Sequence, residues 1–365
     1  MFDFLTQKLN ERKALGLFRS LTNPVGIDFA NNDYLGLARH PEIANAAAAA
    51  YVKYGSGSRG SRLLGGNCEI FEETEKFLAK WKGTESALIF NCGYSANVGV
   101  ISAFCTEGTH LFTDRLDHAS IIDGYSMSKA TLHRFKHNDS ADLERVLKSE
   151  ACAGRSLIAV ESVYSMDGDI APLEKYAELA EKYNALLYVD EAHSDGILNL
   201  KVKAHLTLTT FGKAFGCAGA CVFGSKDLID YLINFSRSFI YSTALPPGAI
   251  AAMRKSVEVA KEESWRGEKA LKMAAEFREK IKKAGFDCLN SETHIVPVIM
   301  GSVEHAFECQ TYLQRNDFFV AVVRPPTVPN NTARLRINIT AAHTEEQVAE
   351  LSEALVGFVQ KNRKI

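Results

Sequence analysis

The sequence predicts an α/β fold, with a mostly parallel central sheet that has helices on both faces and a smaller C-terminal α+β domain. From residue 69 onward, helical patterns alternate with short runs rich in β-branched and aromatic residues. Such alternation is typical of parallel sheets, because parallel strands need a crossover and the crossover is usually a helix. The expected strands are 87–90, 109–112, 156–161, 185–190, 205–209 and 220–223.

Segments on either side of this region complete the outline. Before it we expect a helix at 2–20, a strand at 25–29, an alanine-rich helix at 41–54, a glycine-rich candidate backbone cradle at 55–62 and a helix at 69–81. After Pro246-Pro247 we expect a charged helix at 249–283, strands at 295–299, 319–323 and 335–339, and a helix at 345–360. We therefore divide the chain into an N-terminal helix and arm (1–40), a major domain (41–245) and a C-terminal small domain (246–365).

Length and composition are those of an ordinary globular protein. The 365 residues suffice for about two domains, and 46% of them are hydrophobic and 24% charged. A formal charge of −2 offers no electrostatic basis for binding nucleic acid, and no apolar run is long enough to predict a membrane span. The eight cysteines form no CxxC pair and no metal-binding spacing with histidine, so we expect reduced thiols, no metal and a cytoplasmic location.

Two charged residues at expected strand ends suggest a chemical function. Asp190 ends the strand 185–190, and Lys213 follows the strand 205–209 on a turn that contains glycine. Ligands of open α/β sheets bind at the carboxyl ends of the strands, so both side chains are expected at one site. They form either a plain salt bridge beside a loop, or a site in which Lys213 bonds the aldehyde of pyridoxal phosphate and Asp190 holds a proton on its pyridine nitrogen.

Seven ordered motifs favour the second interpretation. They are NDYLGL (32–37), GSRGSRLL (57–64), NCGYSAN (91–97), DHAS (117–120), ESVYSMDGD (161–169), VDEAH (189–193) and TFGK (210–213). They extend over nearly the whole chain and resemble those of the α-oxoamine synthases, enzymes of the aspartate-aminotransferase fold type I that depend on pyridoxal 5'-phosphate (PLP). The resemblance implies an acyltransferase that joins an amino acid to an acyl thioester with loss of carbon dioxide.

The segments RPPTVP (324–329) and TARLRI (332–337) most resemble family members that use L-alanine and a pimeloyl thioester. The resemblance implies a homodimer, and it leaves open whether the acyl group is carried by coenzyme A or by an acyl carrier protein. Two alternatives also stay open, namely a glycine-using 2-amino-3-ketobutyrate ligase and a non-catalytic partner subunit of the same fold. The presence of Lys213, Asp190 and His118 argues against the non-catalytic subunit.

The resemblance also assigns roles to single residues. Lys213 would bond the cofactor and take the α-proton of alanine, while Asp190 would keep the ring nitrogen protonated. His118 resembles the histidine that stacks on the ring, and His193 the one that bonds the ring's phenolic oxygen. Further cofactor contacts are expected from Gly93 and Tyr94 at a helix start, from Ser165 and Thr210, and from Ser242 and Thr243, which match a segment that reaches a partner subunit's phosphate.

Four residues are candidates for binding the substrates. Arg336 is expected to bind the alanine carboxylate, since a guanidinium offers two parallel donors, and Arg334 on the same strand is the alternative. Asn32 resembles an asparagine near the amino acid, and Thr327 lies within RPPTVP. Arg19 aligns loosely with an arginine proposed to meet the far carboxylate of the acyl chain, and a solvated helix arginine is the alternative.

The sequence departs from the family pattern at four places, one of which is the short stretch between Arg19 and Asn32. The crossover between Asp190 and Lys213 is shorter by roughly ten residues, so either the chain is shorter here or a loop is missing from the sequence. We favour a missing loop, because shortening this crossover would strain the two strands. Phe71 stands where the family often has a histidine, and Asn330-Asn331 where it often has a glycine.

Overall fold

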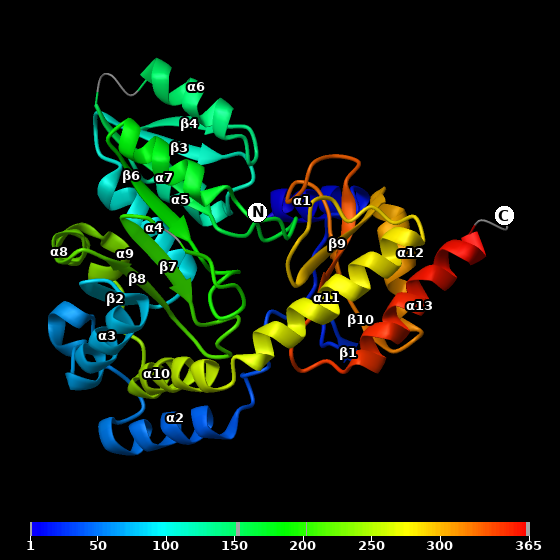
Figure 1. The fold of residues 1–365 in the computed structure, drawn as a ribbon, viewed down its shortest axis with the longest axis horizontal. Coiled ribbons are helices and arrows are strands. Elements are labelled where there is room, and N and C mark those ends of the chain that lie inside the picture. The colour runs from blue at the N-terminus through cyan, green and yellow to red at the C-terminus, as the bar shows by residue number, and fades with distance from the viewer. Residues whose placement is uncertain (1, 151–153, 202, 363–365) are drawn as a thin grey trace.

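A seven-stranded sheet flanked by helices forms the larger part of the fold, and a smaller sheet unit lies beside it (Figure 1). The computed structural model describes residues 2–150, 154–201 and 203–362. The large sheet has the order β2-β8-β7-β6-β5-β3-β4, in which β8 runs antiparallel to both neighbours. Its strands are β2 Ser86–Phe90, β3 Thr109–Asp114, β4 Thr131–Phe135, β5 Arg155–Glu161, β6 Ala185–Asp190, β7 Leu206–Thr210 and β8 Ala220–Gly224. The predicted mostly parallel sheet is confirmed.

Helices cover both faces of this sheet, as predicted. One face carries α4 (Gly93–Phe104), α5 (Ala119–Ser126), α8 (Lys226–Phe235) and α9 (Arg237–Ile240). The other carries α3 (Glu69–Lys82), α6 (Ser140–Glu150), α7 (Leu173–Lys182) and α10 (Pro247–Glu262). Successive residues of β5 pack on opposite faces of the sheet. Leu157 packs with the helices of the first face and Ile158 with those of the second. In the described part of the chain, no helix combines the length and the apolar character that crossing a bilayer requires.

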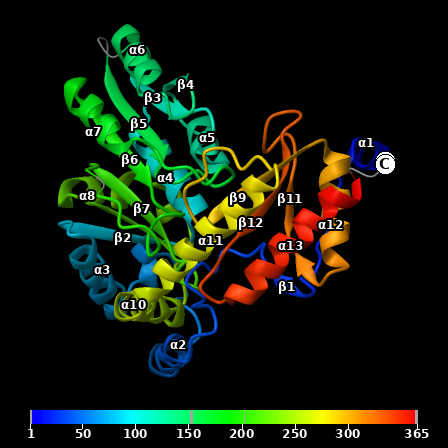
Figure 2. The ribbon, with the colours of Figure 1, turned by 45° about the vertical axis from the view of Figure 1, so that its right-hand side comes forward.

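The C-terminal unit has the predicted α+β arrangement. Its antiparallel sheet has the order β11-β12-β9, and α11 and α13 lie side by side on this unit (Figure 2). The elements are α11 Trp265–Lys283, β9 Ile295–Gly301, α12 Val303–Gln314, β11 Ala321–Val323, β12 Ala333–Asn338 and α13 Glu345–Asn362. The N-terminal strand β1 (Ile27–Asp28) joins the unit by pairing in parallel with β10 (Phe318–Phe319).

The prediction of a single helix at 249–283 was wrong, because the structure has two helices there. The chain breaks at Glu263 and Ser264, between α10 and α11. α10 buries Met253 and Val257 in a core shared with α3, whereas α11 buries Phe277 in the core of the C-terminal unit. The helices separate because they serve different cores. The domain boundaries at 40/41 and 245/246 stay predictions.

The first helix is shorter than expected, and the second has the expected length. α1 (Asp3–Ala14) ends before the predicted limit near Ser20, because Gly16 adopts a φ of 65° and the Leu17 N–H bonds the Arg12 carbonyl at 2.8 Å, a pattern that terminates helices. α2 (Pro41–Tyr54) has the predicted bounds. The glycine-rich segment after it ends in a π-helical turn, Arg62–Gly66, whose Arg62 is ion-paired with Glu75.

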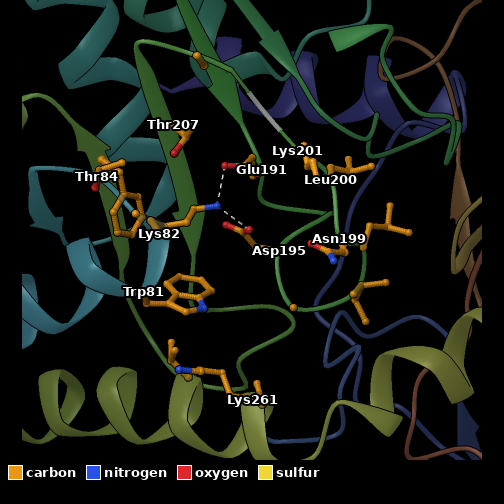
Figure 3. A pocket seen from close by; sticks show the side chains of 18 of the residues that line it. Trp81, Lys82, Thr84, Glu191, Asp195, Asn199, Leu200, Lys201, Thr207 and Lys261 are labelled. Carbon is orange, nitrogen blue, oxygen red and sulfur yellow. Dashed lines mark hydrogen bonds and ion pairs between the residues drawn. The ribbon is translucent and has the colours of Figure 1, made fainter. Parts of the chain in front are cut away.

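The short crossover joins β6 to β7, which are neighbours in the large sheet. The two strands pair in register, with Asp190 beside Leu208. Lys82, at the end of α3, donates to Glu191 Oε2 and Asp195 Oδ1, each at 2.7 Å, and thereby anchors the start of the crossover (Figure 3). The interpretation that a loop is missing from this crossover stays a prediction.

Candidate active site

The carboxyl ends of three parallel strands meet at one site. β5 ends at Glu161, β6 at Asp190 and β7 at Thr210, and these strands are direct neighbours in the sheet. Lys213 follows β7 on a turn, and its Nζ lies 2.8 Å from Nε2 of His193. Open α/β sheets bind ligands at this edge. The structure thus brings Lys213 and His193 into direct contact.

Burial determines the chemistry of Lys213. Desolvation lowers the pKa of its ammonium to about 8, against the opposing attraction of Asp190 and Glu161. A buried amine that loses its proton near neutral pH can act as a nucleophile and as a proton acceptor. Burial, followed by the neighbouring Asp190, also raises the pKa of Glu161. Both effects favour neutral side chains around the amine.

His193 connects Lys213 to three further side chains. Its Nδ1 lies 2.7 Å from the hydroxyl of Tyr34, which donates to Asn32 Oδ1 at 2.9 Å. Arg336 donates to Asn32 Oδ1 at 3.0 Å and to the Tyr34 hydroxyl at 3.3 Å. Because the Tyr34 proton goes to Asn32, Nδ1 of His193 carries its own proton and Nε2 accepts from Lys213. Burial, followed by the charge of Lys213, holds the pKa of His193 well below its usual range, in agreement with this neutral ring.

Asp190 and His118 belong to a second network, on the α4 side. The Asp190 carboxylate accepts from the Ala192 N–H at 2.9 Å and from Asn97 Nδ2 at 2.7 Å, so both oxygens are held. Asn97 also donates to Ser120 Oγ at 2.9 Å, and that hydroxyl lies 2.7 Å from Nδ1 of His118. Burial lowers the pKa of His118. The structure thus links these two predicted residues through Asn97 and Ser120.

The start of α4 and the end of β7 form a cradle for an anion. The first amides of a helix have no partner within it, and together with the helix dipole they attract negative charge. A Cβ atom on Gly93 would lie 2.5 Å from Thr210 Cγ2, so glycine is what permits this close approach. In the described structure Thr210 Oγ1 is buried without a hydrogen-bond partner. Tyr94 is half exposed, and its hydroxyl donates to Asp123 at 2.7 Å.

These groups fit PLP. That cofactor requires an amine for its aldehyde, an acceptor for its pyridine N–H and donors for its phosphate. Lys213 would supply the amine, Asp190 the acceptor, and the cradle of Gly93 and Thr210 the phosphate donors. The orphaned hydroxyl of Thr210 is the feature that a bound phosphate would satisfy.

The two arginines of β12 have different partners. Arg334 is ion-paired with Asp167, with Nη1 and Oδ1 at 2.6 Å, so its charge is balanced within the protein. Arg336 donates from Nε to the Ser165 carbonyl at 2.6 Å and also reaches Asn32 and Tyr34. Of the two, Arg336 is therefore the one connected to Lys213, and it brings Ser165 and Asn32 to the same site.

Arg19 and Thr327 lie in a separate groove of about 870 Å³. Its wall includes Phe18, Met166, Phe307 and Arg324. Arg324 donates to the Phe18 carbonyl at 2.9 Å, and burial and the nearby charge of Arg19 lower its pKa. Because Met166 directly follows Ser165 in the chain, the groove borders the Lys213 site.

Ser242 and Thr243 lie between α9 and α10. The Thr243 carbonyl accepts from Asn91 Nδ2 at 2.9 Å, and Ser242 lines a small pocket together with Arg62. Within one chain, the described structure gives neither residue a hydrogen bond to Lys213 or Thr210.

Several side chains of the site and of the adjoining groove had no role assigned from the sequence, among them Tyr34, Asn97, Glu161 and Arg324. Each stands inside a motif that the sequence analysis quoted, which was the available signal. Their partners are distant in sequence: Tyr34 meets His193, and Asn97 meets Asp190. A single sequence does not reveal such pairs, so the motifs identified the segments and not the contacts.

Comparison with known proteins agrees with this geometry. Residues 24–355 match the family "Aminotransferase class I and II", and the chain belongs to that family and, within it, to the PLP-dependent α-oxoamine synthases. A protein of Bacillus cereus named putative 8-amino-7-oxononanoate synthase is 43% identical over 341 residues, covering 90% of this chain and 86% of the relative. The 8-amino-7-oxononanoate synthase of Citrifermentans bemidjiense is 42% identical over 385 residues, covering 98% of both chains.

A solved structure shows the same fold. Serine palmitoyltransferase from S. paucimobilis, with a bound PLP–myriocin aldimine, superimposes with a TM-score of 0.89 at 28% identity, and the match covers 98% of both chains. The predicted family, fold type and cofactor are confirmed by these comparisons.

Proposed function

We propose that this protein is an 8-amino-7-oxononanoate synthase, which condenses L-alanine with a pimeloyl thioester and releases carbon dioxide, a step of biotin biosynthesis. The observation that carries the proposal is 42% identity over nearly the whole length to a synthase of that name. The geometry supports it, because a buried lysine of lowered pKa adjoins a neutral histidine and an arginine-bound asparagine.

PLP supplies an electron sink for the carbanion that forms when alanine loses its α-proton. Lys213 would hold the cofactor aldehyde, and its neutral Nζ would accept the α-proton of alanine. Asp190 would keep the pyridine nitrogen protonated, and His118 and Ser165 would contact the ring. His193 would bond the phenolic oxygen, and Gly93, Tyr94 and Thr210 would hold the phosphate.

Arg336 and Asn32 orient the amino acid. The guanidinium binds the alanine carboxylate, and the Asn32 amide is fixed by bonds from Arg336 and Tyr34. With the carboxylate held there, Lys213 would accept the α-proton at Nζ, the α-carbon would attack the thioester carbonyl, and the sulfur would leave as a thiol after taking up a proton. The carboxyl group of the amino acid would then depart as carbon dioxide, and Lys213 would return a proton to the α-carbon.

The groove next to Met166 receives the acyl chain. Its apolar wall suits a methylene chain, and Arg19 and Arg324 offer two positive charges to the far carboxylate of a pimeloyl group. Thr327 lines the same groove. The carrier of the thioester is coenzyme A or an acyl carrier protein. We further propose a cytoplasmic homodimer in which Ser242 and Thr243 reach the phosphate bound by the partner subunit.

The test is the visible absorption spectrum of the purified protein with PLP, titrated in turn with L-alanine, glycine and L-serine. We expect a band from lysine-bound PLP that L-alanine perturbs at the lowest concentration and that is absent in Lys213→Ala. A band that responds best to glycine would assign the protein to the 2-amino-3-ketobutyrate ligases. A spectrum unchanged by Lys213→Ala would contradict the catalytic role of the lysine.

A further inference from the structure

Asn97 is a buried amide of α4 that makes three side-chain hydrogen bonds. Its Oδ1 accepts from the Tyr188 hydroxyl at 2.6 Å, and its Nδ2 donates to Asp190 Oδ2 at 2.7 Å and to Ser120 Oγ at 2.9 Å. Only 1% of Asn97 is exposed, so no water competes for these bonds. The amide oxygen of Asn97 and both hydrogens of its amide nitrogen are therefore engaged in hydrogen bonds.

The partners allow one orientation of this amide. A carboxylate can only accept, so the amide nitrogen of Asn97 has to face Asp190. The phenol of Tyr188 keeps its proton, because burial, followed by the neighbouring Asp190, holds its pKa well above the usual range, and it therefore donates to the amide oxygen. A flipped amide would set oxygen against carboxylate and leave the phenol proton without an acceptor. Asn97 is thus fixed from both sides.

The same orientation determines the tautomer of His118. Because Ser120 Oγ accepts from Asn97, its own proton is free for Nδ1 of His118 at 2.7 Å. The Ser120 backbone N–H points at the same nitrogen at 3.3 Å. A ring nitrogen that accepts from two donors carries no proton, so the imidazole proton of His118 lies on Nε2.

We propose that Asn97 is a positioning residue that sets two groups at once, the orientation of the Asp190 carboxylate and the Nε2-protonated tautomer of His118. This inference rests on the proposed function, in which Asp190 meets the pyridine nitrogen of PLP and His118 meets the ring face. The Asn97 amide would then act both on the partner of the pyridine nitrogen, Asp190, and on the tautomer of the histidine at the ring face, His118. In a buried site the loss of one donor leaves an acceptor unsatisfied, so both effects should be measurable.

Other ionisable groups also face Asp190. They are Glu161 from β5, Lys213 after β7, His118 at the start of α5 and the Tyr188 phenol from β6. Among them Tyr188 acts through Asn97, since its hydroxyl bonds the amide oxygen. Asn97→Asp and Ser120→Ala leave all four of these groups in place, and only the fallback variant Tyr188→Phe removes one of them.

The experiment is ¹⁵N NMR of the protein in complex with PLP. The protein is produced with ¹⁵N-labelled histidine, and the PLP carries ¹⁵N in its pyridine ring. Asn97→Asp keeps the shape of the side chain but removes the donor and sets a second carboxyl beside Asp190. We expect the ring nitrogen signal to move toward that of an unprotonated pyridine, and the PLP dissociation constant to rise about 10- to 100-fold, as for loss of a buried hydrogen bond to a charged group. The His118 signals should move as well.

Ser120→Ala separates the two effects. It removes the hydroxyl that reaches His118 and keeps the bond from Asn97 to Asp190, so we expect the His118 signals to move toward a mixture of tautomers while the ring nitrogen signal stays. Ser102→Ala is the matched control on α4, because that hydroxyl bonds only the Gly99 carbonyl of its own helix at 3.5 Å. It should change neither signal.

An unchanged ring nitrogen signal in Asn97→Asp, or unchanged His118 signals in both variants, overturns the inference. If Asn97→Asp does not fold, Tyr188→Phe tests the same arm, since it frees the amide oxygen and should move the ring signal in the same direction by a smaller amount. A wild-type protein that does not bond PLP through Lys213 contradicts the proposed function itself. Normal binding by the wild type with indifferent variants contradicts only the role of Asn97.

Discussion

At the scale of the residue, desolvation is what makes Lys213 reactive. Burial disfavours the charged form of an amine, and it lowers the pKa of Lys213 from 10.5 to about 8. The lysine is therefore largely protonated below this pH and neutral above it. Because only the neutral amine attacks an aldehyde, we predict that the apoprotein captures PLP faster as the pH rises, with a midpoint near 8. Stopped-flow absorbance after mixing apoprotein and PLP measures this rate.

Exposed lysines react with PLP as well, and Lys213→Ala measures that background at each pH. The difference between the two proteins isolates the buried amine. A midpoint close to the 10.5 of an exposed lysine would show that the side chain is not desolvated before the cofactor binds. A rate that does not change with pH would mean that deprotonation of Lys213 does not limit the capture.

Which single residues lie in the site was predictable where a motif coincides with a strand end. Asp190 and Lys213 satisfy both conditions, and the structure places each at the carboxyl edge of the sheet. Geometry also favours Arg336 over Arg334, because Arg334 is paired with Asp167, and the role of Arg336 stays a prediction. Asn97 was not predictable as a contact, since its role depends on Asp190, 93 positions away in the sequence.

At the scale of the element, the crossover between β6 and β7 depends on Lys82. This side chain bridges Glu191 and Asp195, and all three are largely buried, with side-chain exposures of 14%, 4% and 12%. Asp195 also accepts from Thr209 of β7. Lys82→Met would leave two carboxylates unpaired, so we predict a loss of about 3–5 kcal/mol in the free energy of unfolding, measured by urea denaturation of the apoprotein.

Lys80→Met on the same helix is the control, because Lys80 is exposed. Its effect should stay within about 0.5 kcal/mol. Equal stability of Lys82→Met and the wild type would mean that water reaches the two carboxylates, for which the adjoining cavity of about 1010 Å³ provides the space. In that case the turn itself, and not the ion pair, would hold the crossover.

Most elements were predictable because their hydrophobic period is clear, as α2 and β6 show with bounds equal to those predicted. β4 was missed because it is a short edge strand without a clear hydrophobic period. It contains the polar residues His133 and Arg134, and Phe135 is its one buried residue. The break between α10 and α11 was missed for a different reason. Both halves are helical by pattern, and only the change of packing partner separates them.

At the scale of the whole molecule, the site forms where two sheet units meet. Arg336 of β12 bonds the Ser165 carbonyl, and Arg334 of the same strand pairs with Asp167, so the C-terminal unit contacts the segment after β5 at consecutive points. The N-terminal arm adds Asn32 and Tyr34 to the same place. Sequence patterns indicate local structure, and this assembly of three separate segments was beyond them.

The proposed homodimer leads to a prediction about the whole assembly. Ser242 and Thr243 have no hydrogen bond to the Lys213 site of their own chain in the described structure, and Tyr241 beside them is 72% exposed. If the pair acts in the partner's site, a mixed dimer can contain one intact site. Its Lys213→Ala subunit supplies Ser242 and Thr243, and its partner, carrying Ser242→Ala and Thr243→Val, supplies Lys213.

We therefore predict that co-expressing the two variants restores tight PLP binding and condensation activity that each variant lacks alone, measured after separating mixed dimers by two affinity tags. The physical reason is that a phosphate without these donors loses hydrogen bonds to a charged group. If the pair acted within its own chain, each site of the mixed dimer would lack either the lysine or the hydroxyls, and nothing would be restored. A monomer in sedimentation velocity would contradict the prediction before any mixing.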